Sequence, residues 1–249
     1  MGRADLHIHS IYSIDGTDTV AELLEYAAYR DNLDVIAVTD HDDIRGGLEA
    51  AERAGKYGIE AIPGSEVTTL EGHLLALFIE KDIPPRRPLI ETIVRVGEMG
   101  GLCIVPHPNS PLANSLTHEH IRQAASYSDS SQYLVGMEVF TGCLLVNSQT
   151  SPLRSIAHQY HLCEISASDA HVRELIGSGL VRFPANSVAD LRRALVNRQV
   201  TPIIRFNPTG TQVAVSWTKQ AIAKRRNLFD YAREIRNYRA NQKRNSKNV

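Results

Sequence analysis

Apolar residues gather in short runs that recur along the whole chain. The runs are rich in β-branched residues and end at charged residues, Gly, Pro or Asn, which is the pattern of buried strands. We predict strands over residues 4–9, 34–39, 61–67, 74–79, 102–106, 134–140 and 164–168.

Helical periodicity fills most of the intervals between these strands. The first helix begins after Thr19, where Glu22 three residues later completes a capping box, and its apolar stripe starts at Val20. Further helices are predicted over residues 46–57, 89–99, 118–126, 152–160 and 188–197, the last two after Ser151 and Ser187 caps.

Strands that alternate with helices favour parallel pairing, in either an open doubly wound sheet or a closed barrel. The 249 residues match the usual size of a single barrel. The glycine-rich loops of nucleotide-binding open sheets, G-x-G-x-x-G and G-x-x-x-x-G-K-[ST], do not occur in the sequence. We therefore predict an α/β barrel over residues 1–210, followed by a basic helix and a disordered tail over 211–249.

Composition places the chain among globular proteins, with 43% hydrophobic and 22% charged residues. The longest apolar run is far shorter than a membrane span, and the early residues Arg3 and Asp5 do not fit a secretory signal. Cys103, Cys143 and Cys163 form no Cys-x-x-Cys pair, as expected of reduced thiols. We expect a cytoplasmic protein with no membrane partner.

Polar side chains mark the end of the first predicted strand. Asp5, His7 and His9 lie two residues apart, so on a strand they share one face. This face lies at the C-terminal end of the strand, where barrels of this class carry their chemistry. His7 and His9 therefore resemble neighbouring ligands of one metal ion.

Other strand ends carry similar groups. They are the segments Thr39-Asp40-His41-Asp42, Gly64-Ser65-Glu66, His73, Pro106-His107-Pro108 and Ser168-Asp169-Ala170-His171. Imidazole and carboxylate together suit borderline divalent ions such as zinc, manganese or iron. The remaining histidines, at positions 118, 120, 158 and 161, are interpreted as surface residues.

The motifs D-L-H-x-H-S, T-D-H-D, G-S-E, P-H-P and S-D-A-H, in this order, resemble those of the polymerase and histidinol phosphatase (PHP) family. The resemblance covers about residues 4 to 200. It implies a distorted (β/α)7 barrel that binds two to three divalent ions, Mn²⁺, Fe²⁺ or Zn²⁺, and hydrolyses phosphoesters. The stand-alone members active on nucleotide phosphates match better than the polymerase-embedded proofreading domains.

The resemblance also implies a set of ligands. His7, His9 and Asp169 would hold the first ion; Glu66 would bridge it to a second ion on His73 and His107; His41, His171 and Asp15 would hold a third. Several members have histidine at the position of Asp15, whose alternative interpretation is a turn residue before Gly16. Asp5 and Asp40 match positions that orient ligand imidazoles.

Further roles follow from this site. The nucleophile would be a metal-bridging hydroxide, and Asp42 is the candidate general acid, with helix capping as its alternative. Three carboxylates set against three divalent ions leave positive charge that favours an anionic substrate. Arg45 could clamp phosphate or lie exposed on a loop, and Glu138 could contact substrate or fix a ligand histidine.

The charge of −1 conceals an asymmetry. Residues 219–249 contain ten Lys and Arg against two acidic residues, so the remaining chain is strongly acidic. Leu228, Tyr231, Ala232, Ile235 and Tyr238 recur at helical spacing and predict a helix packed on the barrel. This basic helix could bind nucleic acid or steer phosphate-rich substrates, or simply be a solvated face.

We therefore expect a metal-dependent phosphoesterase that acts on phosphomonoesters or nucleotide phosphates, with oligonucleotide 5′ ends as one option. Its partner would be a small phosphorylated substrate, most plainly a nucleotide. Two alternatives stay open: an amidohydrolase-like metallohydrolase, and a catalytically idle metal-binding module with a regulatory or nucleic-acid-binding role.

Overall fold

The computed structural model describes residues 1–142 and 150–245, with side chains of the last helix described up to residue 227. The strands are β1 (Gly2–Ile8), β2 (Val35–Val38), β3 (Glu60–Thr68), β4 (His73–Leu77), β5 (Leu102–Val105), β6 (Leu134–Thr141), β7 (Cys163–Ala167), β8 (Gly179–Phe183) and β9 (Thr201–Ile204). The helices are α1 (Val20–Tyr29), α2 (Arg45–Arg53), α3 (Leu89–Glu98), α4 (His118–Ser126), α5 (Ser128–Ser131), α6 (Thr150–Gln159), α7 (Val188–Val196) and α8 (Gly210–Asn245). Short 3-10 helices cover η1 (Ala54–Tyr57) and η2 (Arg173–Leu175).

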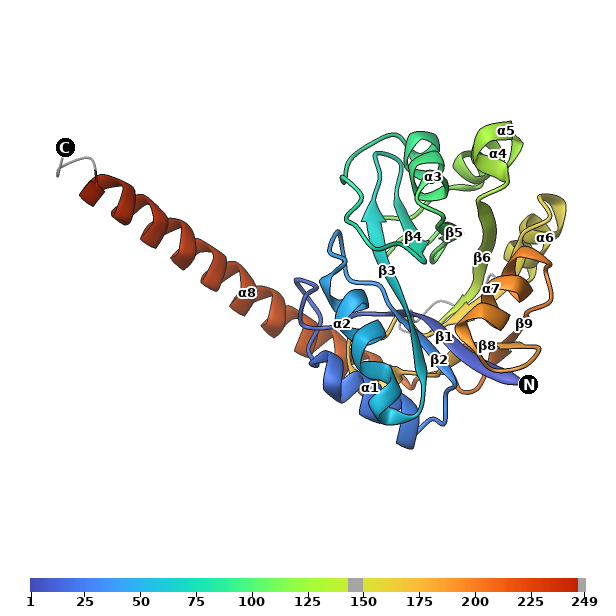
Figure 1. The fold of residues 1–249 in the computed structure, drawn as a ribbon, viewed down its shortest axis with the longest axis horizontal. Coiled ribbons are helices and arrows are strands. Elements are labelled where there is room, and N and C mark those ends of the chain that lie inside the picture. The colour runs from blue at the N-terminus through green and yellow to red at the C-terminus, as the bar shows by residue number, and fades with distance from the viewer. Residues whose placement is uncertain (143–149, 246–249) are drawn as a thin grey trace.

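The strands form one sheet in the order β7-β6-β5-β4-β3-β2-β1-β8-β9, which curls into a nearly closed barrel (Figure 1). Closure comes from the segment after β7, because Ala170 pairs with Ile8 and its carbonyl accepts the His9 N–H at 2.9 Å. The predicted α/β barrel with a C-terminal helix is thereby confirmed.

The expectation of parallel pairing throughout was wrong. β4 runs antiparallel to both β3 and β5, and β8 runs antiparallel to both β1 and β9. Only residues 69–72 link β3 to β4, and a connection this short makes a hairpin, whereas parallel strands need a long crossover. β8 and β9 were not predicted as strands; β9 is a short edge strand that contains Pro202.

The buried apolar residues lie in three clusters, each between strands and a group of helices. One packs α3, α4 and α6 on the strands, the second packs α7, and the third packs α1 and α2. The predicted capping box at Thr19 is present, and the predicted cap at Ser187 also forms a capping box, with Asp190. These helices hold the strands so that their chemistry-bearing ends meet at one mouth.

Helix α8 leaves the barrel as a long rod, and Figure 1 shows its C-terminal part extending away from the body. It runs to Asn245, so the helix continues into the segment that we expected to be disordered. The predicted stripe from Leu228 to Tyr238 lies outside the residues whose side chains are described. Among the described residues, none of the helices combines the length and apolar character that crossing a bilayer requires.

Candidate metal centre

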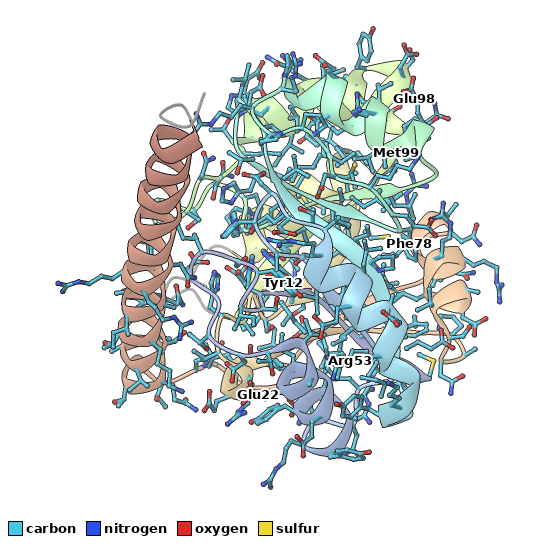
Figure 2. The ribbon with its side chains drawn as sticks, turned by 60° about the vertical axis from the view of Figure 1, so that its left-hand side comes forward. Tyr12, Glu22, Arg53, Phe78, Glu98 and Met99 are labelled. Carbon is cyan, nitrogen blue, oxygen red and sulfur yellow. The ribbon has the colours of Figure 1, made fainter. Side chains whose placement is uncertain are left out.

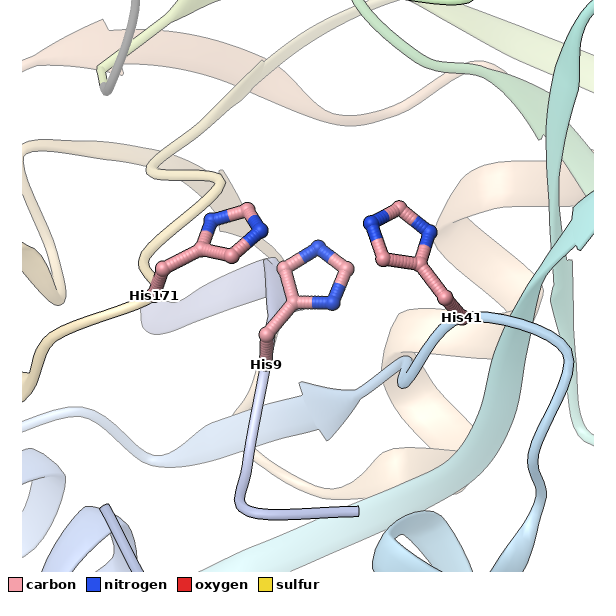
Figure 3. A group of neighbouring side chains, drawn as sticks. All are labelled: His9, His41 and His171. Atoms are coloured by element: carbon pink, nitrogen blue, oxygen red, sulfur yellow. The ribbon is translucent and has the colours of Figure 1, made fainter. Parts of the chain in front are cut away.

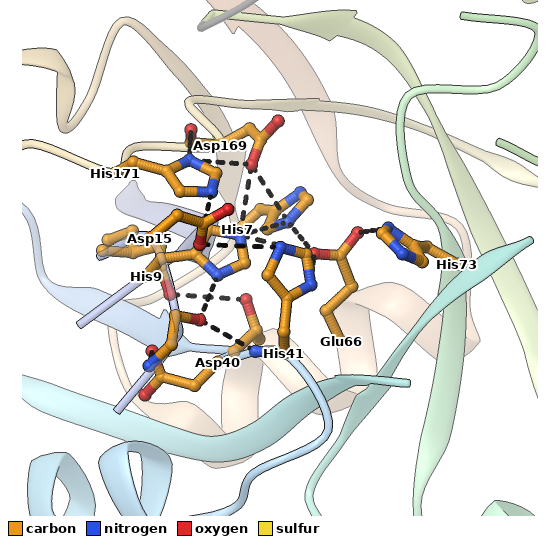
Figure 4. Close-up of polar contacts among 12 residues, drawn as sticks. His7, His9, Asp15, Asp40, His41, Glu66, His73, Asp169 and His171 are labelled. Atoms are coloured by element: carbon orange, nitrogen blue, oxygen red, sulfur yellow. Dashed lines mark hydrogen bonds and ion pairs between the residues drawn. The ribbon is translucent and has the colours of Figure 1, made fainter. Parts of the chain in front are cut away.

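The structure brings all nine predicted ligand residues together at one end of the sheet, and Figure 4 labels all of them except His107. They come from the ends of β1, β2, β3, β5 and β7, from the start of β4, and from the loop between β1 and α1. The residues are His7, His9, Asp15, His41, Glu66, His73, His107, Asp169 and His171. Segments that are far apart in the chain therefore build one site.

Four of these side chains form a compact set at the centre of the group. His7 Nε2 lies 3.1 Å from His9 Nε2, 3.3 Å from Glu66 Oε2 and 3.3 Å from Asp169 Oδ1. His9 Nε2 lies 3.2 Å from Asp169 Oδ1 and 3.4 Å from Glu66 Oε2. Ligands about 2.0–2.1 Å from a tetrahedral ion lie about 3.3–3.4 Å from one another, so these atoms are spaced to share one ion.

The other oxygen of Glu66 faces two more imidazoles. Glu66 Oε1 lies 2.8 Å from His107 Nε2 and 2.9 Å from His73 Nδ1. One carboxylate therefore presents each of its oxygens to a different set of imidazoles, which is the arrangement of a ligand that bridges two ions.

A third set also includes His9. His9, His41 and His171 offer nitrogens within 4.8 Å of one another (Figure 3). Asp15 Oδ1 lies 3.4 Å from His171 Nε2 and 3.9 Å from His41 Nε2. His41 also turns Nδ1 toward Glu66 Oε2, at 3.0 Å, so this imidazole lies between two sets.

Several buried polar atoms of the centre are not satisfied by hydrogen bonds to one another, and a bound cation would satisfy them. Three buried side-chain atoms lie close to other polar groups but make no hydrogen bond with them: Asp15 Oδ1, Glu66 Oε2 and His73 Nδ1. Buried polar atoms without a hydrogen bond are costly unless something else satisfies them. Although burial opposes ionisation, His41, His7 and His73 hold the pKa of Glu66 well below its usual value, so Glu66 is an anionic ligand.

Further side chains hold the free nitrogens of the ligand imidazoles: Glu138, for which the sequence left this role open, and two serines that the sequence did not indicate. His7 Nδ1 lies 2.9 Å from Glu138 Oε1, His9 Nδ1 lies 3.0 Å from Ser13 Oγ, and His107 Nδ1 lies 3.0 Å from Ser115 Oγ. Such contacts fix the tautomer and the orientation of a ligand ring.

Asp5 and Asp40 do not contact imidazoles, contrary to the prediction. Asp5 accepts the backbone N–H groups of Ser168 and Gly177, at 3.1 and 2.8 Å. Asp40 accepts the backbone N–H of Ser10 at 2.6 Å and its hydroxyl at 2.7 Å. Both carboxyls are buried, and burial raises their pKa, to about 6 for Asp5. They fix the backbone that carries the ligands.

A model of the PHP domain matches residues 5–199, most of the chain and every predicted ligand. The chain belongs to the PHP domain family. It is 41% identical over 124 residues to an uncharacterized protein of Methanocaldococcus jannaschii, covering 46% of this chain and 72% of that protein. It is also 39% identical over 94 residues to a 5′-3′ exoribonuclease of Haemophilus influenzae, 36% of this chain and 34% of that enzyme.

A solved structure shares the PHP fold. It is a two-domain protein of Bacteroides vulgatus that contains a predicted PHP-like metal-dependent phosphoesterase. The likeness has a TM-score of 0.65 at 22% identity and covers 87% of this chain and 69% of that one. At this identity the likeness shows the fold alone.

Three further residues that were predicted to serve the site, Asp42, Arg45 and Glu138, lie outside the set of metal ligands. Asp42 lines the cavity above the centre and accepts the Thr68 N–H at 2.7 Å, so it also fixes β3. Arg45 is exposed, pairs with Asp43 and does not line this cavity. Glu138 is fully buried behind His7, where it also accepts the His107 N–H at 2.8 Å, so it lies away from any substrate.

A cavity of about 780 Å³ opens above the metal centre of the PHP domain. Its floor includes Asp15, His41, Glu66, His73, His107, Asp169 and His171. Its walls include residues that the sequence analysis did not single out: Arg86 from the loop before α3, and Trp217, Gln220 and Lys224 from α8. Their positions in the sequence gave no signal, because only the fold brings them to the centre.

Proposed function

We propose that this protein is a metal-dependent phosphoesterase that hydrolyses phosphomonoesters, nucleotide phosphates among them. The observation that carries the proposal is the set of four ligand atoms on His7, His9, Glu66 and Asp169, whose 3.1–3.4 Å separations suit one tetrahedral ion. Family membership supports the same activity.

Bound divalent ions would supply a hydroxide nucleophile at neutral pH and would neutralise charge that develops on the phosphoryl oxygens. The side chains would hold these ions at fixed distances from one another. Glu66, in contact with both imidazole pairs, sets the spacing of the first two sites, while Glu138 and Ser13 keep His7 and His9 in their ligating orientation.

Charge supports a phosphate ligand. Three carboxylates, on Asp15, Glu66 and Asp169, face the centre, so a full set of divalent ions leaves it positive. Arg86 and Lys224 add cations to the cavity walls. We assign Arg86 the phosphate-contacting role that Arg45, paired with Asp43, does not fill.

A leaving alkoxide needs a proton. Asp42 is exposed on the cavity wall and is our candidate donor. Its bond to Thr68 N–H gives it a structural duty as well, so the informative variant is Asp42→Asn, which keeps an acceptor. We expect a lower kcat on alkyl phosphates, and little change on a nitrophenyl ester, whose leaving group needs no proton.

Oligonucleotides are the larger substrate that we propose, because the exoribonuclease relative acts at nucleic-acid ends by its name and α8 is basic. Removing residues 228–249 should lower kcat/KM on a 5′-phosphorylated oligonucleotide and weaken its salt dependence, with the mononucleotide unaffected. Equal effects on both substrates would refute the steering role.

The activity is tested by purification without chelators, metal analysis, and an assay over Mn²⁺, Zn²⁺ and Fe²⁺ with nucleotides, sugar phosphates and a C–N amide panel. We expect phosphate release that His107→Ala abolishes. Hydrolysis of amides alone would support the amidohydrolase alternative, and no turnover by metal-loaded protein would support the idle module.

A further inference from the structure

The first half of α8 packs against the barrel although it lies beyond the matched PHP region. Val213, Ser216 and Ala223 are buried on one face of this helix. Lys219 Nζ lies 3.2 Å from Glu174 Oε1, and Asn227 Nδ2 donates to the Ile14 carbonyl at 2.9 Å. Figure 1 and Figure 2 show the N-terminal part of α8 beside the body, and Figure 1 shows the rest of the helix extending away from it. These contacts fix the helix relative to the loop that carries Asp15.

A second stripe of the helix faces the cavity. Trp217, Gln220 and Lys224 are spaced by three and four residues, so they lie on one side of α8, and all three line the cavity above the metal centre. The side chain of Trp217 keeps 39% of its surface exposed there. The helix therefore supplies an aromatic face, an amide and a cation to one wall.

The cavity changes character from its floor to its rim. The floor consists of the imidazoles and carboxylates of the centre, whereas Ile14, Leu112 and Ala113 add apolar surface beside Trp217. A ligand that fits both regions carries an anionic group at one end and a flat ring with a polar edge at the other. A nucleotide has this composition, and a sugar phosphate lacks the ring.

We propose that α8 is the specificity wall of the enzyme: Trp217 stacks on the nucleobase, Gln220 faces the polar edge of the base, and Lys224 contacts the sugar-phosphate part. This inference rests on the proposed phosphoesterase function and names its substrate class. Base–aromatic stacks are sequence-tolerant, so the wall would accept any base.

Binding is tested first without turnover. Trp217 is the only tryptophan of the chain, so its fluorescence reports on this wall alone. The probe is an adenosine 5′-phosphonate in which CH₂ replaces the ester oxygen, added to Mn²⁺-loaded protein, with inorganic phosphate as the ring-free comparison. We expect saturable quenching by the phosphonate and none by phosphate. Equal responses to both would overturn the inference.

Steady-state kinetics then test whether Trp217 contributes to binding of the base in particular. Trp217→Leu should raise KM for AMP about 5- to 150-fold, the factor that the loss of one base–aromatic stack gives, with KM for ribose 5-phosphate unchanged. Trp217→Phe should restore most of the affinity. Ile222 is an exposed residue of α8 that does not line the cavity, so Ile222→Ala is the matched control. It should change KM for neither substrate.

The outcomes distinguish this inference from the function on which it rests. If Trp217→Leu raises KM for both substrates equally, or for neither, α8 does not bind the base. If the wild-type protein hydrolyses no phosphoester but the phosphonate still quenches Trp217, the proposed activity is wrong and the nucleotide-binding wall stands.

Discussion

Replacing Glu138 with glutamine tests how the centre holds its first histidine. Glu138 is fully buried, and its two oxygens take three contacts: His7 Nδ1 at 2.9 Å, the His107 N–H at 2.8 Å and the Thr141 hydroxyl at 2.6 Å. Glutamine fills the same volume but has one accepting oxygen and one donating NH₂ group. If that oxygen keeps the His107 and Thr141 contacts, the NH₂ group faces His7.

An NH₂ group beside His7 Nδ1 favours the tautomer with the proton on Nε2, the nitrogen that points into the metal centre. The variant must therefore either lose the contact to His7 Nδ1 or keep a proton on His7 Nε2, and a protonated Nε2 cannot bind a metal ion. Losing an outer partner of a metal-binding histidine typically weakens metal affinity about 10- to 100-fold, or about 1.4–2.7 kcal/mol. We expect Glu138→Gln to lie at the upper end of that range.

The assay is activity measured against free Mn²⁺ or Zn²⁺ fixed by a chelator buffer, followed by KM at saturating metal. Glu164→Gln is the matched control, because that carboxylate also pairs with an imidazole, His158 Nε2 at 2.7 Å, but away from the centre. Unchanged metal affinity together with a raised KM would refute the reasoning and give Glu138 the substrate contact that the sequence left open.

Three further predictions follow from the same geometry. Asp15→Ala should lower the number of bound metal ions per chain and Asp15→His should restore it, as metal analysis after dialysis can show; equal metal content in all three proteins would exclude a ligand role. Gly46→Ala should lower the melting temperature, because its Cβ would lie 1.9 Å from a buried carboxylate oxygen, whereas Gly55→Ala, with open space around it, should not. Although burial opposes it, the facing carboxylates raise the pKa of His41 to about 9, so below that pH metal binding should release protons and tighten as pH rises. Calorimetry in two buffers of different ionisation enthalpy measures this release, and a buffer-independent enthalpy would contradict it.

The family resemblance implied the full ligand set, and strand periodicity independently pointed to its first pair. Side chains two residues apart on a strand share a face, so His7 and His9 had to point the same way. Strand ends converge at one mouth of a barrel, which brought Glu66, His107 and Asp169 to the same place from distant parts of the chain.

Apart from Glu138, whose role toward a ligand histidine the sequence left open, the supporting residues could not be predicted, because their signal exists only in three dimensions. Ser13 and Ser115 are ordinary loop serines until the fold places their hydroxyls against imidazole nitrogens. Asp5 and Asp40 looked like imidazole partners, but backbone N–H groups of neighbouring segments reach their oxygens instead.

The topology, too, could be predicted only in part from the sequence. Helix–strand alternation gave the layers and the barrel, yet the direction of β4 depends on a four-residue connection and that of β8 on where the chain returns to β1. The part of α8 that lines the cavity was predicted only as a basic helix, because its inward face is set by the barrel it packs on.

We infer that Glu66 joins two metal ions in a phosphoesterase centre. The most direct measurement is metal content per chain and phosphate release for the wild-type protein and Glu66→Gln, purified in parallel with Mn²⁺ and compared by thermal unfolding. We expect at least two bound ions and turnover for the wild type, and the loss of at least one ion and of nearly all turnover for the variant. A variant that keeps both its ions and its activity would contradict it.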